Sequence, residues 1–386
     1  MLVCMVLMFA FSLNFIRRKF FDLFLRIHWV LFLVVFIVGM AHGAALALVG
    51  IVPWIIDLLF RLVYRTQIYK QGTFFKTKDA DNANLDSNRN VLNASNGIGV
   101  IAREQISVAA LPGSITRVSF PRVRKETGEV FEFEAGQYAF LCIPSISRLE
   151  WHPFTISSSP HEDIVSFYIK SSGDWTAKVL LAASKSDGAK APFNILVDGP
   201  YGLVSIDIDS PEAYSHFALF AGGIGVTPMR SILNWLHYER NTLGRSEIKR
   251  VNFVWAVPNL DAIHALFDNV PNGEEGVASV GYFPGGIIRN EPNNAFVTEF
   301  YLTDAEMEGE NPVEQKVGHC LRYGSRPDMV AILRALGDQA KRDGKDRVAV
   351  LACGPMPMVQ SALATSMTLS KDMKVQFDVH TEVFEF

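Results

Sequence analysis

Residues 217–228 read Phe-Ala-Leu-Phe-Ala-Gly-Gly-Ile-Gly-Val-Thr-Pro. Five apolar residues that match a buried strand lead into a glycine-rich turn, and a run with the period of an amphipathic helix follows. The apolar positions of that run share one helical face: Met229, Ile232, Leu233 and Leu236. Glycines let the backbone approach a phosphate and a helix start supplies free N–H groups, so the turn is a candidate phosphate loop. A lone turn of this kind can equally serve only to join a strand to a helix.

Two further apolar runs, 251–256 and 348–352, have the length of buried strands and are separated by helical patterns. This alternation predicts a parallel α/β sheet over residues 213–386. The second run ends at Cys353-Gly354-Pro355, and ligands bind at the carboxyl ends of such strands. An isolated cysteine is most often a small buried residue, but a second strand end in the same domain makes Cys353 a candidate site residue.

The middle of the chain has a different pattern. Residues 101–212 contain short β-rich runs, such as 130–133 and 138–143, separated by proline and glycine, which is typical of an antiparallel β-barrel. Before it, residues 66–100 are assigned to a polar linker, because Asp, Asn, Ser, Lys and Gly prevail there without an apolar period.

The N-terminal part is the most apolar. The 386 residues are 49% hydrophobic and 20% charged, with a mean hydropathy of +0.17, which is high for a purely soluble enzyme. No Asp, Glu, Lys or Arg occurs from Ile27 to Ile56, and about 20 apolar residues suffice to cross a bilayer. The run predicts spans over about 20–41 and 45–64, with a partial third span over 1–16. Residues 1–65 are therefore expected to lie in a lipid bilayer.

Charge indicates the orientation and excludes one class of partner. Basic residues cluster at the outer ends of the two predicted spans: Arg17, Arg18, Lys19 and Arg26 around the start of the first, and Arg61, Arg65 and Lys70 around the end of the second. Both clusters are expected on the cytoplasmic face, so everything after Tyr64 is expected to be cytosolic. The net charge of −4 offers no general polyanion-binding surface, so we expect no nucleic-acid partner. The four scattered cysteines suit a reducing compartment.

Further motifs follow one another in a set order. Residues 151–160 read Trp-His-Pro-Phe-Thr-Ile-Ser-Ser-Ser-Pro, residues 170–176 read Lys-Ser-Ser-Gly-Asp-Trp-Thr, and residues 199–202 read Gly-Pro-Tyr-Gly, with Gly136-Gln137-Tyr138 upstream. Together with the glycine turn and Cys353, this order resembles the flavin and nicotinamide domains of the ferric reductase/NADPH oxidase family, part of the ferredoxin-NADP reductase superfamily. The resemblance covers nearly the whole chain, although any one motif alone is weak evidence.

The resemblance implies two cofactors, FAD and NADPH, and a residue set for each. The residues implied to line the flavin are His152, Pro153, Phe154 and Thr155, with Thr155 close to the reactive nitrogen of the ring. Those implied to hold the FAD diphosphate are Lys170, Trp175 and Thr176, and Gly199 belongs to the same cofactor-binding set. Those implied to take the nicotinamide nucleotide are Gly222, Gly223, Gly225 and Thr227, with Cys353 and Gly354 beside the nicotinamide ring.

The chemistry belongs to the cofactors, so the protein is expected to act by positioning two rings rather than by acid–base catalysis. The implied catalytic set is Thr155, Cys353 and Phe384. Phe384 fits the terminal Glu-x-Phe pattern whose aromatic ring covers the flavin, and Phe386 competes for that place. A terminal strand that packs both rings into the core is the alternative.

The choice between NADPH and NADH depends on one arginine. The family sequence Gly-Arg-Pro is present with one inserted residue as Gly324-Ser325-Arg326-Pro327, so Arg326 is expected to face the 2′-phosphate. Pro258 stands where the family often has an arginine, which weakens the preference for NADPH.

Two histidines lie in the uncharged run. His28 and His42 are 14 residues apart. On a helix they lie within about 40° of one face and ~21 Å apart, as stacked haems require. The resemblance implies that they ligate haem b; the alternative is a pair of interface histidines that snorkel to headgroups. Residues 1–27 contain no histidine for the opposite ligand positions. The chain is therefore expected to be an N-terminally incomplete family member or a form without haem function.

The resemblance implies a membrane-anchored reductase in which cytosolic NADPH reduces FAD and single electrons cross the membrane to a ferric chelate. The alternative within the family is a superoxide-generating NADPH oxidase, whose acceptor is dioxygen. The alternative of another class is a non-catalytic membrane subunit with a vestigial flavin domain. The intact motifs at 152–155 and 222–227 argue against it.

Overall fold

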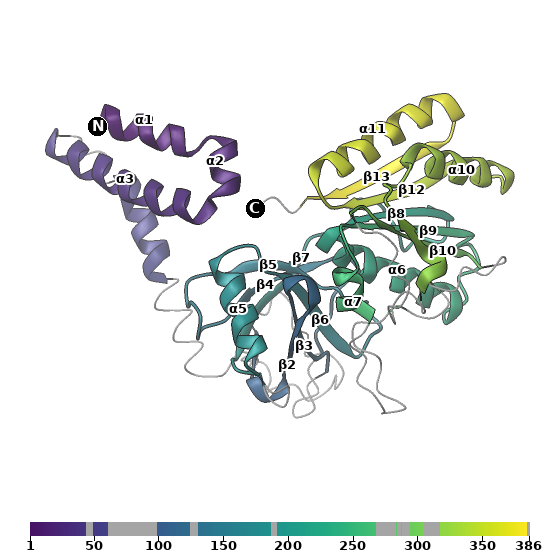
Figure 1. The fold of residues 1–386 in the computed structure, drawn as a ribbon, viewed down its shortest axis with the longest axis horizontal. Helices are drawn as coiled ribbons and strands as arrows, with labels where there is room; N and C mark the ends of the chain where they lie inside the picture. The colour runs from purple at the N-terminus through teal and green to yellow at the C-terminus, as the bar shows by residue number, and fades with distance from the viewer. Residues whose placement is uncertain are drawn as a thin grey trace, which may run out of the picture.

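A computed structural model describes residues 1–43, 49–60, 99–123, 130–186, 191–267, 283, 287, 294–304 and 317–383. Figure 1 shows N-terminal helices to one side of a β domain and an α/β domain, and Arg26 of these helices forms an ion pair with Asp174 of the β domain at 3.1 Å. Most of the predicted linker, together with Phe384 and Phe386, lies outside the described residues.

One N-terminal helix is long and apolar enough to cross a membrane. It is α3, Phe21–Ala41, whose segment Leu23–Ala41 has a mean hydropathy of 2.3 and is only 6% buried. The predicted partial span is instead two short helices, α1 (Leu2–Phe11) and α2 (Asn14–Lys19), because the backbone becomes extended at Leu13. Of the returning span, the structure describes only the apolar helix Val49–Phe60, and the rest of it lies outside the described residues. Among the described residues, the expected set of spans thus reduces to one candidate.

The β domain consists of antiparallel strands: β1 (Gly99–Ile101), β2 (Ser107–Leu111), β3 (Ile115–Pro121), β4 (Tyr138–Cys142), β5 (His152–Thr155), β6 (Ile164–Lys170) and β7 (Ile195–Tyr201). The predicted barrel is divided into two sheets, β1-β7-β4-β5 and β2-β3-β6. At the seam the Ser157 N–H donates to the Ser166 carbonyl at 2.9 Å. The predicted strand over 130–133 is only an isolated bridge at Val130, although Phe131 and Phe133 are buried in the core. Helix α5 (Asp174–Ser184) buries Trp175 against this core.

The α/β domain confirms the predicted parallel sheet. Its strands are β8 (His216–Gly222), β9 (Arg250–Val257), β10 (Phe296–Leu302), β11 (Leu321–Tyr323), β12 (Arg347–Cys353) and β13 (Gln376–Glu382), in the order β11-β10-β9-β8-β12-β13. Helices α6 (Val226–Asn241) and α7 (Asp261–Phe267) cover one face, and α10 (Met329–Arg342) and α11 (Met356–Met373) cover the other (Figure 1).

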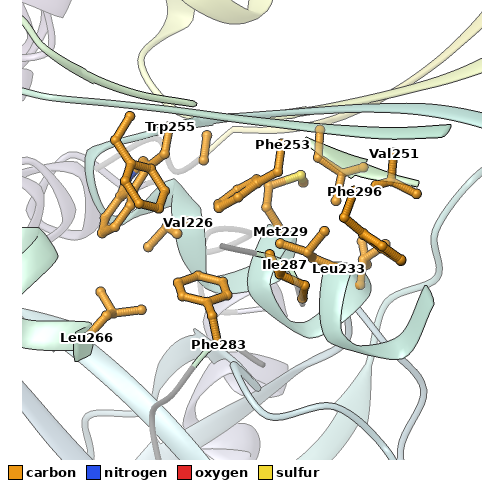
Figure 2. Close-up of a cluster of buried hydrophobic side chains, with 14 of the residues drawn as sticks. Val226, Met229, Leu233, Val251, Phe253, Trp255, Leu266, Phe283, Ile287 and Phe296 are labelled. Atoms are coloured by element: carbon orange, nitrogen blue, oxygen red, sulfur yellow. The ribbon is translucent and has the colours of Figure 1, made fainter. Parts of the chain in front are cut away.

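Burial on both faces explains why residues 217–221 are apolar without alternation. Phe217 and Leu219 pack in the cluster that includes α6, whereas Ala218 and Phe220 pack in the cluster that includes α10 and α11. Figure 2 shows part of the first cluster, where Val226, Met229 and Leu233 of α6 lie beneath Phe253 and Trp255 of β9.

The same cluster extends into the β domain. Leu111, Ile115 and Tyr168 of the β domain belong to the hydrophobic core that surrounds Ile232 of α6. A shared core makes the two domains one packing unit, because separating them exposes apolar side chains to water.

Three histidines, of which His216 is buried and His161 and His237 are half-buried, predict that stability falls in mild acid. Burial lowers the pKa of His161, His216 and His237 below the ordinary value, so each takes up a proton less readily in the folded than in the unfolded chain, where protonation begins at about pH 6.5. His216 is fully buried between Ser215 and Asp343, whose carboxylate opposes the shift that burial causes.

We therefore expect the thermal midpoint of the wild type to fall between pH 7 and pH 5, with a shallower fall in His216→Gln. Each histidine contributes at most about 1.4 kcal/mol per pH unit, because it binds at most one proton. The measurement is thermal unfolding followed by circular dichroism across that range. Equal slopes in the two proteins would contradict the role of His216.

Candidate functional site

The two groups of predicted cofactor residues meet at the start of α6. The Ser231 hydroxyl of α6 donates to the Ser158 carbonyl at 2.6 Å and accepts from the Gly136 N–H at 3.3 Å. Ser158 follows β5 closely, and α6 begins directly after the glycine turn. The structure thus anchors the loop after β5 to Ser231 of α6, within two turns of the glycine turn.

Within the glycine turn, the glycines have different surroundings. Gly223 has a φ of +54°, and no atom lies within 4 Å of the place where a Cβ would stand. A Cβ on Gly225 would stand 2.3 Å from the Cys353 carbonyl oxygen. Gly225 is therefore required by the packing of the turn on β12, whereas Gly223 leaves open space in front of the backbone.

Two side chains hold the turn in this conformation. The Trp255 indole N–H donates to the Gly223 carbonyl at 2.9 Å, and the Thr227 hydroxyl donates to the Ile224 carbonyl at 3.1 Å. Thr227 is buried, and the bond of its hydroxyl to the Ile224 carbonyl ties the start of α6 to the glycine turn. Trp255 was not predicted from the sequence, although its place at the carboxyl half of a predicted strand was a usable signal.

Cys353 and Gly354 lie beside this turn. Gly354 packs closely on Gly222, the last residue of β8. The Cys353 side chain is fully buried, and burial raises the pKa of its thiol well above the ordinary value, with a further increase from the Glu382 carboxylate. The thiol therefore stays protonated near neutral pH and is no nucleophile.

The structure adds a polar pair that was not predicted from the sequence. Glu382 stands opposite Cys353 in the β12–β13 register. His380 lies on the same strand, with its Nε2 3.5 Å from a Glu382 carboxylate oxygen and its Nδ1 3.1 Å from the Ser205 N–H. The sequence signal for this pair is the terminal Glu-x-Phe motif, which begins with Glu382, although the prediction used only its aromatic residue.

The predicted flavin residues form an aromatic group in the β domain. The ring of Trp175 lies 4.4 Å from that of His152 and 5.9 Å from that of Phe154, in a stacked arrangement with the latter. Pro153 is exposed and Thr155 is buried at the end of β5. The buried indole N–H of Trp175 has no hydrogen-bond partner among the residues that the structure describes.

The second part of the flavin set lies at the start of α5. Lys170 is exposed at the end of β6. The Thr176 hydroxyl accepts from the N–H groups of Ser172 and Gly173 at 2.9 and 3.0 Å, so it closes the turn before the helix. Gly199 lies in β7, where it packs tightly on Ala139 of β4.

The remaining predicted residues lie elsewhere. Arg326 is exposed in the loop between β11 and α10, at the carboxyl edge of the sheet. His28 lines a cavity of about 530 Å³ between α3 and the helix Val49–Phe60, and its Nδ1 has no hydrogen-bond partner among the described residues. The Nδ1 of His42 lies 2.8 Å from the Val38 carbonyl at the end of α3. Across the described ranges, no three His, Cys, Asp or Glu side chains gather as a metal site.

Comparison with known proteins identifies the family of the chain. A sequence family described as an FAD-binding domain matches residues 100–205. NADPH oxidase 1 of Mus musculus is 40% identical over 147 residues, which are 38% of this chain and 24% of that protein. A superoxide-generating NADPH oxidase heavy chain of Dictyostelium discoideum is 31% identical over 288 residues, 68% of this chain and 51% of that protein. The respiratory burst oxidase homolog protein B of Solanum tuberosum is 27% identical over 323 residues, 74% of this chain and 36% of that protein.

The chain thus spans between about a quarter and a half of the length of these relatives. The match to an FAD-binding domain falls on the β domain that carries the aromatic group, and two of the relatives extend over most of this chain. The chain therefore belongs to the ferric reductase/NADPH oxidase family.

Proposed function

We propose that the chain is a flavoprotein oxidoreductase that carries electrons from NADPH through FAD to an acceptor across a membrane. The observation that supports this most directly is that the glycine turn and the loop after β5 both meet α6. The turn leads into this helix, and the loop is bound to it by the Ser231 hydroxyl, which donates to the Ser158 carbonyl at 2.6 Å. Two cofactor sites held on one helix suit direct transfer between two bound rings.

The residues of the β domain fit FAD. His152, Phe154 and Trp175 offer flat surfaces, and the indole N–H of Trp175 is a buried donor that the described residues leave for a ligand. Lys170 and the first N–H groups of α5 are suited to a diphosphate. When bound, FAD supplies the capacity to accept a hydride and release single electrons.

The α/β domain fits a nicotinamide nucleotide. The open space before Gly223 allows a phosphate to approach the backbone, and the positive end of the α6 helix dipole favours an anion there. Arg326 lies at the same edge of the sheet, where a guanidinium suits a 2′-phosphate. Cys353 is neutral and buried, so it excludes water beside the turn without taking a proton.

The acceptor that we propose is a ferric chelate. The competing acceptor is dioxygen, because one relative carries superoxide generation in its name. Fe³⁺ reduction and superoxide release, measured with NADPH on one preparation, separate the two. A preparation that binds no FAD would favour the non-catalytic membrane protein instead.

We further propose that α3 crosses the membrane and that the β and α/β domains lie on its cytosolic side. The support is the hydropathy of Leu23–Ala41 and the basic residues that precede it. His28 and His42 offer one imidazole each, and the described residues 1–43 and 49–60 hold no other histidine. A bis-histidine haem needs two imidazoles, so these residues do not complete a haem site and no electron-transfer step is assigned to one.

The phosphate loop is tested by Gly223→Val in the detergent-solubilised chain. A branched side chain there occupies the space that we assign to a phosphate, so we expect NADPH-driven dye reduction to fall by about tenfold or more at unchanged FAD content. The matched control is Gly244→Val, because Gly244 also has a positive φ, +79°, and open space, but follows the far end of α6. Equal loss of FAD and nucleotide binding would mean that the turn is only structural.

The cofactor preference is tested by Arg326→Ala. Loss of a charged hydrogen bond to the 2′-phosphate is expected to narrow the ratio of kcat/KM for NADPH over NADH by about tenfold. Arg334→Ala, at an exposed position on α10, controls for the loss of surface charge. A wild type without any preference for NADPH would contradict the role of Arg326.

A further inference from the structure

A buried arginine joins the two domains. Arg230 of α6 is only 1% exposed. Its Nη1 donates to the Ser157 carbonyl at 2.5 Å, and its Nη2 donates to the Glu162 carboxylate at 3.2 Å. Both partners belong to the β domain, in the segment 157–162 that follows β5.

Neighbouring residues complete a polar contact that we name the interdomain clamp: Arg230, Ser231 and Asn234 of α6 with Ser157, Ser158, Ser159 and Glu162 of the β domain. The Ser159 hydroxyl donates to the Ser231 carbonyl at 2.9 Å. The Asn234 amide donates to the second oxygen of Glu162 at 3.0 Å. Both carboxylate oxygens of Glu162 therefore accept a hydrogen bond from α6, one from Arg230 and one from Asn234, which lies one turn further along the helix.

Aromatic rings border the clamp. The ring of His161 stacks on that of Tyr238 of α6 at 4.0 Å, with 5° between their planes. Trp235, on the same helix, lies 6.1 Å from His161. These rings shield the clamp on one side and fix the direction in which segment 157–162 leaves β5.

Such a contact gives orientation more than stability. Burying a guanidinium costs desolvation energy that a single ion pair barely offsets, so an apolar contact of the same area would hold the domains as well. Hydrogen bonds, in contrast, are directional and weaken steeply when donor and acceptor shift. The clamp therefore favours one relative placement of the domains over the slightly shifted ones that an apolar contact tolerates.

The clamp also lies close to both cofactor sites. Arg230 is five residues beyond Gly225, or about 7 Å along a helix. Ser157 is two residues beyond Thr155, or about 7 Å along an extended chain. A shift at the clamp is thus transmitted over a short distance to the turn on one side and to β5 on the other.

We propose that Arg230 is a positioning residue, which sets the separation of the nicotinamide and flavin sites through the clamp. The proposal rests on the proposed function, because it presumes hydride transfer between those sites. The guanidinium of Arg230 is buried between Ser157 and Glu162, which lie outside both sets of predicted cofactor residues, so its loss is expected to slow the transfer step without weakening the binding of either cofactor. A misplacement of about 1 Å is enough to cost about 100-fold in rate.

The test uses the detergent-solubilised full chain and anaerobic stopped-flow reduction of its flavin by NADPH. In Arg230→Met we expect the limiting rate constant to fall by about 10- to 100-fold, with FAD content and the NADPH dissociation constant within about threefold of the wild type. Arg230→Lys should recover part of the rate. The loss should also be non-additive with that in Glu162→Gln, because the two residues form one contact.

Arg240→Met is the matched control, since Arg240 lies on the same helix and donates to the carbonyl of Ile248 within the α/β domain. It should leave the rate unchanged. A rate in Arg230→Met no lower than in Arg240→Met, or a loss fully accounted for by missing FAD, overturns the proposal.

Hydrogen exchange separates this result from a failure of the proposed function. In Arg230→Met the amides of residues 157–162 should exchange faster than in the wild type, whether or not NADPH is a substrate. A wild type that binds FAD but is not reduced by NADPH overturns the proposed function. Unchanged exchange in Arg230→Met shows that the clamp does not hold the domains and overturns the inference by itself.

Discussion

Helix α6 packs on the parallel sheet through Met229, Ile232 and Leu233, and it bonds to the β domain through the side chains between and beyond them. The guanidinium of Arg230 is only 1% exposed, and a buried charge destabilises the fold unless hydrogen-bond acceptors surround it. The arrangement of helix and β domain therefore has to keep those acceptors in place. Segment 157–162 supplies those acceptors only when β5 ends where it does. The place of the helix, the end of β5 and the glycine turn therefore depend on one another, and a change at any of them is expected to disturb the other two.

The parallel sheet could be predicted from the sequence because its strands are buried on both faces. Runs such as 217–221 and 348–352 are apolar throughout, and the turn after the first has the residues that a strand-to-helix connection needs. Arg230 could not be predicted as buried, since a charged residue within an amphipathic helix is ordinarily solvated. Only the approach of a distant segment, 73 residues away at Ser157, supplies its acceptors. The prediction of a strand over 130–133 was wrong, because this segment pairs with another only at the isolated bridge of Val130.

In the N-terminal helices, too, one feature could be predicted from the sequence and another could not. Composition alone predicts a span near 20–41, because hydropathy is local and needs no partner. The break after α1 depends on one extended residue, Leu13, whose sequence carries neither proline nor glycine as a signal. The exposed apolar surface of α3 is costly in water and favourable in lipid, which is why its low burial agrees with a membrane setting.

The glycine turn shows how one motif combines folding and binding. Gly225 is closed in by the Cys353 carbonyl, so its lack of a side chain serves the packing of the turn on β12. Gly223 has open space where a Cβ would stand, and its carbonyl accepts a hydrogen bond from the Trp255 indole, which fixes the peptide while that space stays open. A spacing of two residues thus separates a position that the fold needs from one that a ligand can use. Sequence patterns cannot distinguish these roles, because both require the same residue type for different neighbours. The distinction depends on how closely β12 approaches the turn, since a Cβ on Gly225 would meet the Cys353 carbonyl whereas one on Gly223 would meet nothing.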